Sequence, residues 1–358
     1  MEKILFTGQE FKSGLFDLID SAKEKLSIST YIFGNDDFGL EVINKLKVKA
    51  EQGLKVQLIV DGIGSWKWLN HYKNKLPSHL ELAVFHPLPW PLGYWEWPRL
   101  ESFIFINRRN HHKIFIVDDK QAIIGSRNLC KESLRWREIS ILLDSHAEIE
   151  ALKNLFTWTW EHCKGHRKNV FNLQKLNPPK ANIYANNNLV ARIRRYKSLL
   201  NQLKQCQTHI YLTTPYFAPP RRFINILIKK AKAGKDVRIL LPHKTDVIVS
   251  QWIARNHYNE LLQAGVKIYE YQPEVLHAKT LIVDNWVLLG SSNFNQRSFK
   301  RDLEVDIVLQ QTDTIAELKV KFFADLNQST ELNLKDWVGP NLGIKILLFI
   351  ILLFSGWF

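Results

Sequence analysis

The sequence has 358 residues, of which 46% are hydrophobic, and it carries 49 Lys and Arg against 35 Asp and Glu, a formal net charge of +14. This length exceeds that of an average single domain, and the charge favours a polyanionic partner, either nucleic acid or an anionic membrane surface. The three cysteines have no metal-ligand spacing and indicate a reducing compartment, and the opening "MEKILFTGQEF" lacks the long apolar core of a signal peptide.

The predicted elements, taken in chain order, occur twice. "LSISTYIF" from Leu26 corresponds to "IYLTTPYF" from Ile210, and "GLKVQLIVDG" from Gly53 corresponds to "GKDVRILLPHK" from Gly234. In each half the pattern predicts a strand, a helix and a strand, followed later by a hairpin. The sequence therefore predicts two similar α/β units.

The boundaries follow from this repeat. We expect a first unit at 1–163, a polar and basic linker at 164–188 and a second unit at 189–330. The first half is longer than the second before its hairpin, which places an insertion at 86–102. Its aromatic residues suit a lipid interface, although core packing or a lid over the site are alternatives; they include Trp90, Tyr94, Trp95 and Trp97.

Each half contains a strand that carries His and Lys two residues apart. The stretches are "HHKIFIVDDKQAIIGSRN" from His111 and "HAKTLIVDNWVLLGSSN" from His277. Folded as hairpins in which His faces Asn and Lys faces Ser, each presents an imidazole, an ammonium, a hydroxyl and an amide on one face. A lone His-Lys pair would be an ordinary polar surface, but the repeat favours a phosphate-handling site. The two sets are His111, Lys113, Ser126 and Asn128, and His277, Lys279, Ser291 and Asn293.

Both stretches resemble the paired HxKxxxxD…GSxN signature of the phospholipase D superfamily. Segments from Ser29, Thr214 and Tyr258 are also similar to bacterial cardiolipin synthases, and the resemblance covers roughly residues 10–328. It implies an α/β fold of two phospholipase D-like sandwich units related by pseudo-twofold symmetry, with the active site at their interface.

The resemblance also implies roles for the signature residues. His111 would be the nucleophile that forms a phosphohistidine, and His277 the general acid that later becomes the base, although the near-symmetry permits the reverse. The Lys, Ser and Asn residues of both sets would bind the phosphoryl oxygens. A glutamate after each signature would fix a histidine nitrogen: Glu304 fits this pattern and Glu138 fits it one residue out.

We expect other residues of the signatures to have structural rather than catalytic roles. Asp118 and Asp284 lie at the predicted turns and should hold the loops. His112 alternates to the opposite strand face and is not expected in the chemistry. We expect no metal and no other cofactor, because no carboxylate or Cys/His cluster has ligand spacing.

Four functions remain open. The first is a cardiolipin synthase-type phosphatidyltransferase, which condenses two phosphatidylglycerols. A hydrolase or a transphosphatidylase with another acceptor is the second, a nuclease the third and a non-catalytic binder the fourth. Intact signatures in both halves argue against the binder, and the aromatic insertion and apolar tail argue against the nuclease, so we expect an anionic phospholipid substrate and no nucleic acid.

The C-terminal tail, 337–358, carries an apolar run from Ile346 to Phe354. Nine residues are too few to span a bilayer, which needs about 20. An interfacial anchor is favoured because Lys345 can snorkel and Trp357 suits the headgroup level, with a buried terminal helix as the alternative. We therefore expect association with a membrane surface, at the cytoplasmic face of a bacterial inner membrane; the oligomeric state is left open.

Overall fold

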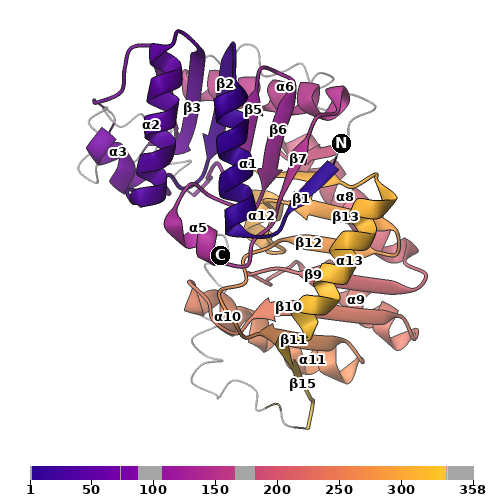
Figure 1. The fold of residues 1–358 in the computed structure, drawn as a ribbon. Helices are drawn as coiled ribbons and strands as arrows, with labels where there is room; N and C mark the ends of the chain where they lie inside the picture. Colours follow the sequence, from indigo (N-terminus) through magenta and orange to yellow (C-terminus); the bar gives the residue numbers. More distant parts are fainter. Residues whose placement is uncertain (1, 73, 88–106, 166–181, 336, 338–358) are drawn as a thin grey trace.

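The computed structural model describes residues 2–72, 74–87, 107–165, 182–335 and 337. Two β-sheets form its framework (Figure 1). The strands of the first sheet are β1 (Glu2–Leu5), β2 (Lys25–Thr30), β3 (Lys55–Asp61), β4 (Leu80–Phe85), β5 (Ile114–Val117), β6 (Gln121–Gly125) and β7 (Ser140–Leu143). Their order across the sheet is β1-β7-β6-β5-β2-β3-β4.

The second sheet repeats this arrangement. Its strands are β8 (Ile183–Ala185), β9 (His209–Thr213), β10 (Asp236–Pro242), β11 (Lys267–Tyr271), β12 (Thr280–Val283), β13 (Trp286–Gly290), β14 (Val305–Val308) and β15 (Ser329–Leu332). Their order is β15-β11-β10-β9-β12-β13-β14-β8. Apart from the added edge strand β15, each strand has its counterpart at the same position of the first sheet. The prediction of two similar α/β units is confirmed.

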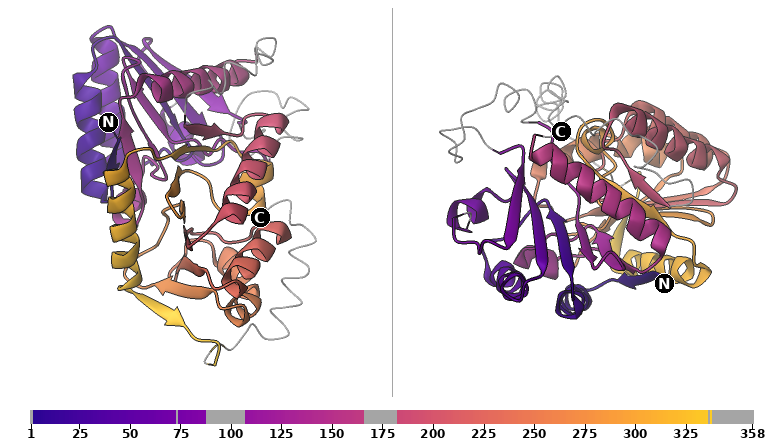
Figure 2. Two further views of the ribbon diagram at one scale, coloured as in Figure 1. Left: turned by 90° about the vertical axis from the view of Figure 1, so that its right-hand side faces the viewer. Right: turned by 90° about the horizontal axis from the view of Figure 1, so that it is seen from above.

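Helices cover the sheets on both faces (Figure 2). The described helices of the first half are α1 (Gly8–Ser21), α2 (Asp37–Glu51), α3 (Trp66–Tyr72), α5 (Lys131–Arg135) and α6 (His146–Cys163). Those of the second half are α8 (Leu189–Gln205), α9 (Arg221–Lys232), α10 (Ile248–Asn256), α11 (Tyr258–Gln263), α12 (Gln296–Lys300) and α13 (Thr312–Leu326).

Local sequence explains these elements. The strand "KVQLIVD" of β3 is buried from its second residue onward, as a parallel strand covered on both faces should be. Helix α1 begins at a capping box, in which the Glu10 N–H donates to Thr7 Oγ1 at 3.1 Å and the Thr7 N–H donates to Glu10 Oε2 at 2.9 Å.

One hydrophobic core is shared by the two halves. It contains Ile116 and Ile124 of the first sheet, Ile282 and Leu289 of the second, and Phe322 of α13. Separate cores lie between each sheet and its outer helices. Burying each large apolar side chain stabilises the fold by about 1.5–3 kcal/mol. Separating the sheets would expose the shared core, so the two halves form one structural body and hold their interface in a fixed geometry.

Part of the predicted linker belongs to the second sheet. Ile183–Ala185 forms β8, which pairs antiparallel with β14 and completes that edge. The proposed unit boundaries otherwise stay predictions. Residues 88–102 of the insertion and 338–358 of the tail lie outside the described residues. Within the described part of the chain, no helix is long and apolar enough to cross a membrane.

The predicted hairpin register is wrong by one residue in both halves. Ile114 pairs with Ile124 in the first hairpin, and Thr280 pairs with Leu289 in the second. Both turns are tighter than expected, because Asp118 and Asp284 adopt left-handed backbone conformations, with φ of 52° and 54°. The His and Lys residues lie just before these ladders, so strand pairing does not by itself set their orientation.

Candidate active site

Backbone hydrogen bonds across the interface bring the two signatures together. The His111 N–H donates to the Leu303 carbonyl at 2.9 Å, and the Leu303 N–H donates to the Arg109 carbonyl at 2.9 Å. In the other half, the His277 N–H donates to the Arg137 carbonyl at 2.8 Å. Each histidine segment is therefore bonded to the residue that directly precedes the glutamate of the other half.

This crossing pairs each histidine with the opposite glutamate. His111 Nδ1 lies 3.0 Å from Glu304 Oε2, and His277 Nδ1 lies 3.2 Å from Glu138 Oε1. Both glutamates are fully buried. The sequence predicted the two glutamates as histidine partners without saying which glutamate meets which histidine; the one-residue difference in spacing does not prevent Glu138 from making the same contact.

The surroundings of His111 leave one ring nitrogen available. Its Nδ1 faces two acceptors, Glu304 Oε2 and the Ser291 carbonyl oxygen, each at 3.0 Å. This geometry assigns the hydrogen to Nδ1 and a lone pair to Nε2. Burial, followed by the charges of Lys113 and Lys279, holds the pKa of His111 well below its ordinary value. At neutral pH the ring is uncharged, as a nucleophile requires.

His277 has a different neighbour. Its Nδ1 lies 2.9 Å from Lys279 Nζ, which also donates to the His277 carbonyl at 2.6 Å. An ammonium can only donate, so a charged Lys279 places the hydrogen on Nε2, whereas Glu138 favours a hydrogen on Nδ1. Burial and Lys279 lower the pKa of His277, and Glu138 opposes this shift. A histidine that acts as a general acid must carry hydrogens on both ring nitrogens, so that a neutral ring remains after it gives up one proton, and Glu138 is the acceptor for the hydrogen on Nδ1 of that form.

The two lysines are buried near the histidines. Lys113 is 0% exposed and Lys279 is 1% exposed, and Lys113 Nζ donates to the His111 carbonyl at 2.9 Å. Burial lowers the pKa of Lys113 to about 8 and that of Lys279 to about 7. The carboxylates Glu138 and Glu304 oppose both shifts, so two cations and two carboxyl groups form one coupled cluster.

The two carboxyl groups differ in their pKa. Burial raises the pKa of Glu304, and Lys113 opposes it only in part. Burial acts in the same direction on Glu138, but the charges of His277 and Lys279 outweigh it and lower the pKa to about 2. Glu138 is therefore firmly ionised, so the two halves of the cluster are not equivalent.

The signature serines bond to protein groups rather than facing open space. Ser126 Oγ donates to the Ile139 carbonyl at 3.0 Å and accepts from the Ile139 N–H at 2.9 Å. Ser291 Oγ donates to Glu304 Oε2 at 2.5 Å and accepts from the Val305 N–H at 3.0 Å. These bonds hold the strand end and the glutamate in place, and the expectation that the two hydroxyls bind phosphoryl oxygens stays a prediction.

Steric crowding explains why the two signatures have glycine at positions 125 and 290. A Cβ at Gly125 would lie 2.4 Å from the Ile139 carbonyl oxygen, and one at Gly290 would lie 2.4 Å from the Val305 carbonyl oxygen. Strands β7 and β14 approach too closely for any side chain. The close approach of these strands brings Ser126 and Ser291 within hydrogen-bond distance of Ile139 and Glu304.

The signature asparagines line the pocket between the halves. Asn128 Oδ1 accepts from the Ile32 N–H at 3.2 Å. Asn293 is 5% exposed, and within the described part of the chain its Oδ1 has no hydrogen-bond partner. An unpaired buried polar group costs free energy, so this oxygen is left available to accept a hydrogen bond in the pocket.

The signature aspartates lie at the far ends of the hairpins. Asp118 accepts from the N–H groups of Lys23, Glu24 and Lys25 at 2.8–2.9 Å. Asp284 accepts in the same way from the start of β9, including the Thr208 N–H at 2.9 Å. Each carboxylate thus ties its hairpin turn to the neighbouring central strand, and neither contributes to the pocket lining described below.

A pocket of about 490 Å³ joins these groups. It is lined by both histidines and by residues that sequence reasoning did not assign a role. Tyr31 packs against His111 with ring centroids 5.1 Å apart, and Tyr216 packs against His277 at 5.9 Å. Their matching places in "TYIF" and "PYF" were a usable signal. The further lining residues include Ile32, Ile63, Asn107, Arg109, Trp136, Asp246, Val247, Asn295, Arg297 and Asp302.

Buried ion pairs hold the pocket wall beside His111. Arg109 Nη1 lies 3.4 Å from Asp61 Oδ1, and Arg297 Nε lies 2.6 Å from Asp302 Oδ2. The Arg109 N–H also donates to Asp302 Oδ1 at 2.9 Å, which links the two halves. Burial raises the pKa of Asp302 to about 6. Each ion pair lies within one half, and the bond from the Arg109 N–H to Asp302 crosses the interface, so sequence spacing gives no signal that the two pairs meet.

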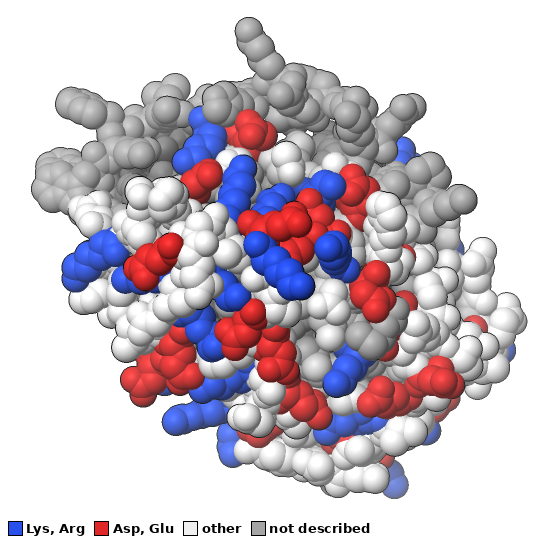
Figure 3. Space-filling model, turned by 45° about the horizontal axis from the view of Figure 1, so that its top comes forward, with Lys and Arg blue, Asp and Glu red and all other residues white. Residues whose placement is uncertain are grey.

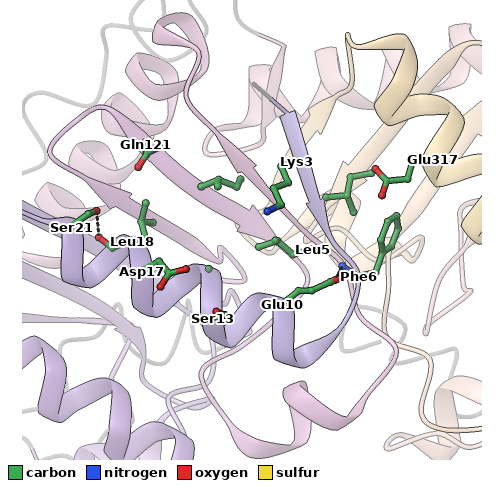
Figure 4. Close-up of a pocket in the computed structure, with 13 residues that line it drawn as sticks. Lys3, Leu5, Phe6, Glu10, Ser13, Asp17, Leu18, Ser21, Gln121 and Glu317 are labelled. Carbon is green, nitrogen blue, oxygen red and sulfur yellow. Dashed lines mark hydrogen bonds between the residues drawn. The ribbon is translucent and has the colours of Figure 1, made fainter.

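Another pocket, of about 600 Å³, lies beside β1 and α1 (Figure 4). Its labelled side chains include Lys3, Glu10, Asp17 and Glu317 but no histidine, so the larger volume does not mark the chemistry. His112 is fully buried, with a pKa lowered to about 3 by burial. Among the described residues, no group of three His, Cys, Asp or Glu could hold a metal ion.

Comparison with known proteins places this geometry in a family. Residues 15–160 and 199–326 match the family described as "Cardiolipin synthase, PLD-like domain". The cardiolipin synthase of Halalkalibacterium halodurans is 29% identical over 94% of this chain and 68% of the relative. That of Geobacillus kaustophilus is 30% identical over 91% of this chain and 66% of the relative. The chain thus spans about two thirds of these relatives' length.

Solved structures share the fold. A phosphatidylserine synthase from Haemophilus influenzae Rd KW20 matches with a TM-score of 0.73 at 14% identity, covering 99% of this chain and 94% of that one. A polyphosphate kinase from Porphyromonas gingivalis matches with a TM-score of 0.63 at 10% identity, covering 99% and 53%. With two signatures meeting in one pocket and the family match on both halves, the chain belongs to the family of cardiolipin synthase, phospholipase D-like domains, and it is a phosphodiester transferase or hydrolase of the phospholipase D superfamily.

Proposed function

We propose that the chain is a phosphatidyltransferase of the cardiolipin synthase type, which condenses two phosphatidylglycerols to cardiolipin and glycerol. The observation that carries the proposal is that both histidines, each paired with a buried glutamate, line one pocket between the halves. The similarity to cardiolipin synthases over 94% of the chain supports this substrate class.

In the first step, the Nε2 lone pair of His111 attacks the phosphorus of one phosphatidylglycerol. A P–N bond forms while the P–O bond to the glycerol headgroup breaks, and His277 gives a proton to the departing alkoxide. Two properties favour His111 as the nucleophile: its Nδ1 faces two acceptors, and its pKa is held well below the ordinary value.

In the second step, a hydroxyl of another phosphatidylglycerol gives its proton to His277. Its oxygen forms a bond to phosphorus as the P–N bond breaks, which regenerates neutral His111 and releases cardiolipin. Throughout, Lys113 and Lys279 balance the phosphoryl charge, and Asn293 Oδ1 accepts a hydrogen bond from a headgroup hydroxyl. The sequence of steps needs no oxidant or reductant.

The site is suited to a membrane surface. Val247, at the pocket, is 38% exposed and Ile248, next to it, is 59% exposed, which places apolar side chains beside the lining. On the face shown in Figure 3, Lys and Arg are interspersed with Asp and Glu rather than forming one basic patch. These features support a lipid surface over a polynucleotide, with localisation at the cytoplasmic face of a bacterial inner membrane as part of the proposal.

The test is to incubate the purified chain with phosphatidylglycerol labelled in its acyl chains and to resolve the lipid products. Labelled cardiolipin with an equal yield of glycerol is the expected result. Phosphatidic acid alone would show that water is the acceptor and make the chain a hydrolase. Unchanged lipid together with cleavage of single-stranded DNA would favour the nuclease.

A further inference from the structure

The pocket has different walls beside its two histidines. After β2, Tyr31 covers His111, and the β3–α3 connection contributes Ile63 to the lining. After β9, Tyr216 covers His277, and the corresponding β10–α10 connection contributes Asp246. The pocket lining from these two connections thus includes a carboxylate in the second half and only an apolar side chain in the first.

Tyr216 holds Asp246 in this wall. The Tyr216 hydroxyl donates to Asp246 Oδ2 at 2.7 Å, while the Tyr216 ring lies edge-on to the His277 ring. This bond occupies one of the about four acceptor positions of a carboxylate. Asp246 is exposed, and its charge raises the pKa of both His277 and Lys279, which places it within electrostatic reach of the reacting groups.

The charge of Asp246 excludes some ligands and suits others. A carboxylate repels a phosphoryl group, so Asp246 does not bind the phosphoryl oxygens. It accepts hydrogen bonds from hydroxyl groups, and its two oxygens can accept from two neighbouring hydroxyls of one alcohol. The alcohol that leaves, and the alcohol that enters, must both pass beside the general acid and base.

We propose that Asp246, held by Tyr216, is the acceptor-binding residue, which accepts a hydrogen bond from one hydroxyl of a glycerol headgroup while the neighbouring hydroxyl faces His277, and so selects a diol over a simple alcohol. This inference rests on the proposed function. That neighbouring hydroxyl gives its proton to His277, and its oxygen bonds to the phosphorus on His111 as the P–N bond breaks.

The experiment measures competition between two alcohols. The full chain, in mixed detergent micelles, receives acyl-labelled phosphatidylglycerol together with equal concentrations of deuterated glycerol and 1-propanol. The ratio of deuterated phosphatidylglycerol to phosphatidylpropanol reports how one phosphatidyl-enzyme chooses its acceptor. It does not depend on the amount of folded protein or on the rate of the first step.

The unaltered chain should favour glycerol. Asp246→Ala should lower the product ratio by about tenfold or more, as expected for losing hydrogen bonds to a charged group. Asp246→Asn keeps one acceptor oxygen, so its product ratio should lie between those of the unaltered chain and Asp246→Ala. Tyr216→Phe should lower the ratio by a smaller factor than Asp246→Ala does. Asp17→Asn removes the same charge in the pocket of Figure 4 and should leave the ratio unchanged.

Two results would overturn the inference. An unchanged ratio in Asp246→Ala and in Tyr216→Phe would show that neither residue selects the acceptor, while cardiolipin formation by the unaltered chain would leave the proposed function intact. Products from water alone in the unaltered chain would overturn both the inference and the proposed function.

Discussion

The two halves of the site share a signature but not an environment. Nδ1 of His111 faces two acceptors, whereas Nδ1 of His277 has a lysine ammonium 2.9 Å away. The glutamate on His111 has a raised pKa, and the one on His277 has a pKa lowered to about 2. The repeated fold thus supplies matching groups, and their differing neighbours can give two identical histidines different tasks.

The largest predicted effect is the loss of either histidine. His111→Ala and His277→Ala should each lower turnover by several orders of magnitude, because the two histidines act as one unit. The measurement is initial rates of lipid product formation. Replacing His112 by Gln serves as the control for a change within the signature, and near-normal turnover in either alanine variant would contradict the mechanism.

Replacing either glutamate should cause the next largest loss of activity. Glu304→Gln and Glu138→Gln remove the carboxylate that orients each ring, and we expect losses of about 10²–10⁴ in kcat. The crossed pairing can be tested by NMR of the imidazole nitrogens. Glu304→Gln should perturb the ring of His111 more than that of His277, and the opposite pattern would show that the pairing is not crossed.

The rate of the reaction should fall at both acid and basic pH, for different reasons. The rate should fall at acid pH as His111 gains a proton, below the ordinary histidine range, because the nucleophile must be neutral. It should fall again as pH rises, first as His277, whose pKa is lowered by burial, loses the proton it gives to the alkoxide, and further through about 7, where Lys279 loses its charge. Glu138→Gln should move the basic limb to lower pH, since Glu138 raises the pKa of both Lys279 and His277. A basic limb that stays in place would contradict this coupling.

The smallest predicted effect concerns stability. Lys279 has a pKa of about 7 in the folded chain against 10.5 when unfolded, so the unfolded chain binds the extra proton between these values. The free energy of unfolding should therefore rise with pH in this window, by at most about 1.4 kcal/mol per pH unit. Lys279→Met should reduce that slope. Lys113→Met should reduce the slope only above a pH of about 8, the pKa of Lys113 in the folded chain. Denaturant unfolding at several pH values measures both, and equal slopes in all three proteins would contradict it.

Much of the fold was accessible from the sequence. The repeated apolar strands and the two signatures predicted paired α/β units, because binary patterning and turn residues are local signals. The hairpin register was missed because it depends on left-handed backbone at Asp118 and Asp284. The short strand β8 was missed because its three residues gain stability only from pairing with β14.

Only the site residues that occur in both halves could be predicted from the sequence. The histidines, lysines and glutamates stand out because each has a counterpart in the other half. Asp246 and Asp302 have no such counterpart, and their place follows from loops that meet across the interface. The protein partners of the serine hydroxyls were not predicted, because the close strand packing that directs Ser126 and Ser291 toward them leaves no local signal in the motif.

The central claim is that His111 carries the phosphatidyl group. The most direct measurement is to incubate His277→Ala and His111→Ala with a phosphorus-labelled phosphatidyl ester of an activated leaving group, which departs without a general acid, then to quench them with denaturant and map the labelled residue by mass spectrometry. We expect an acid-labile phosphatidyl adduct on His111 in the His277→Ala variant and no adduct in His111→Ala. An adduct on His277 in the His111→Ala variant would contradict the account and reverse the two roles.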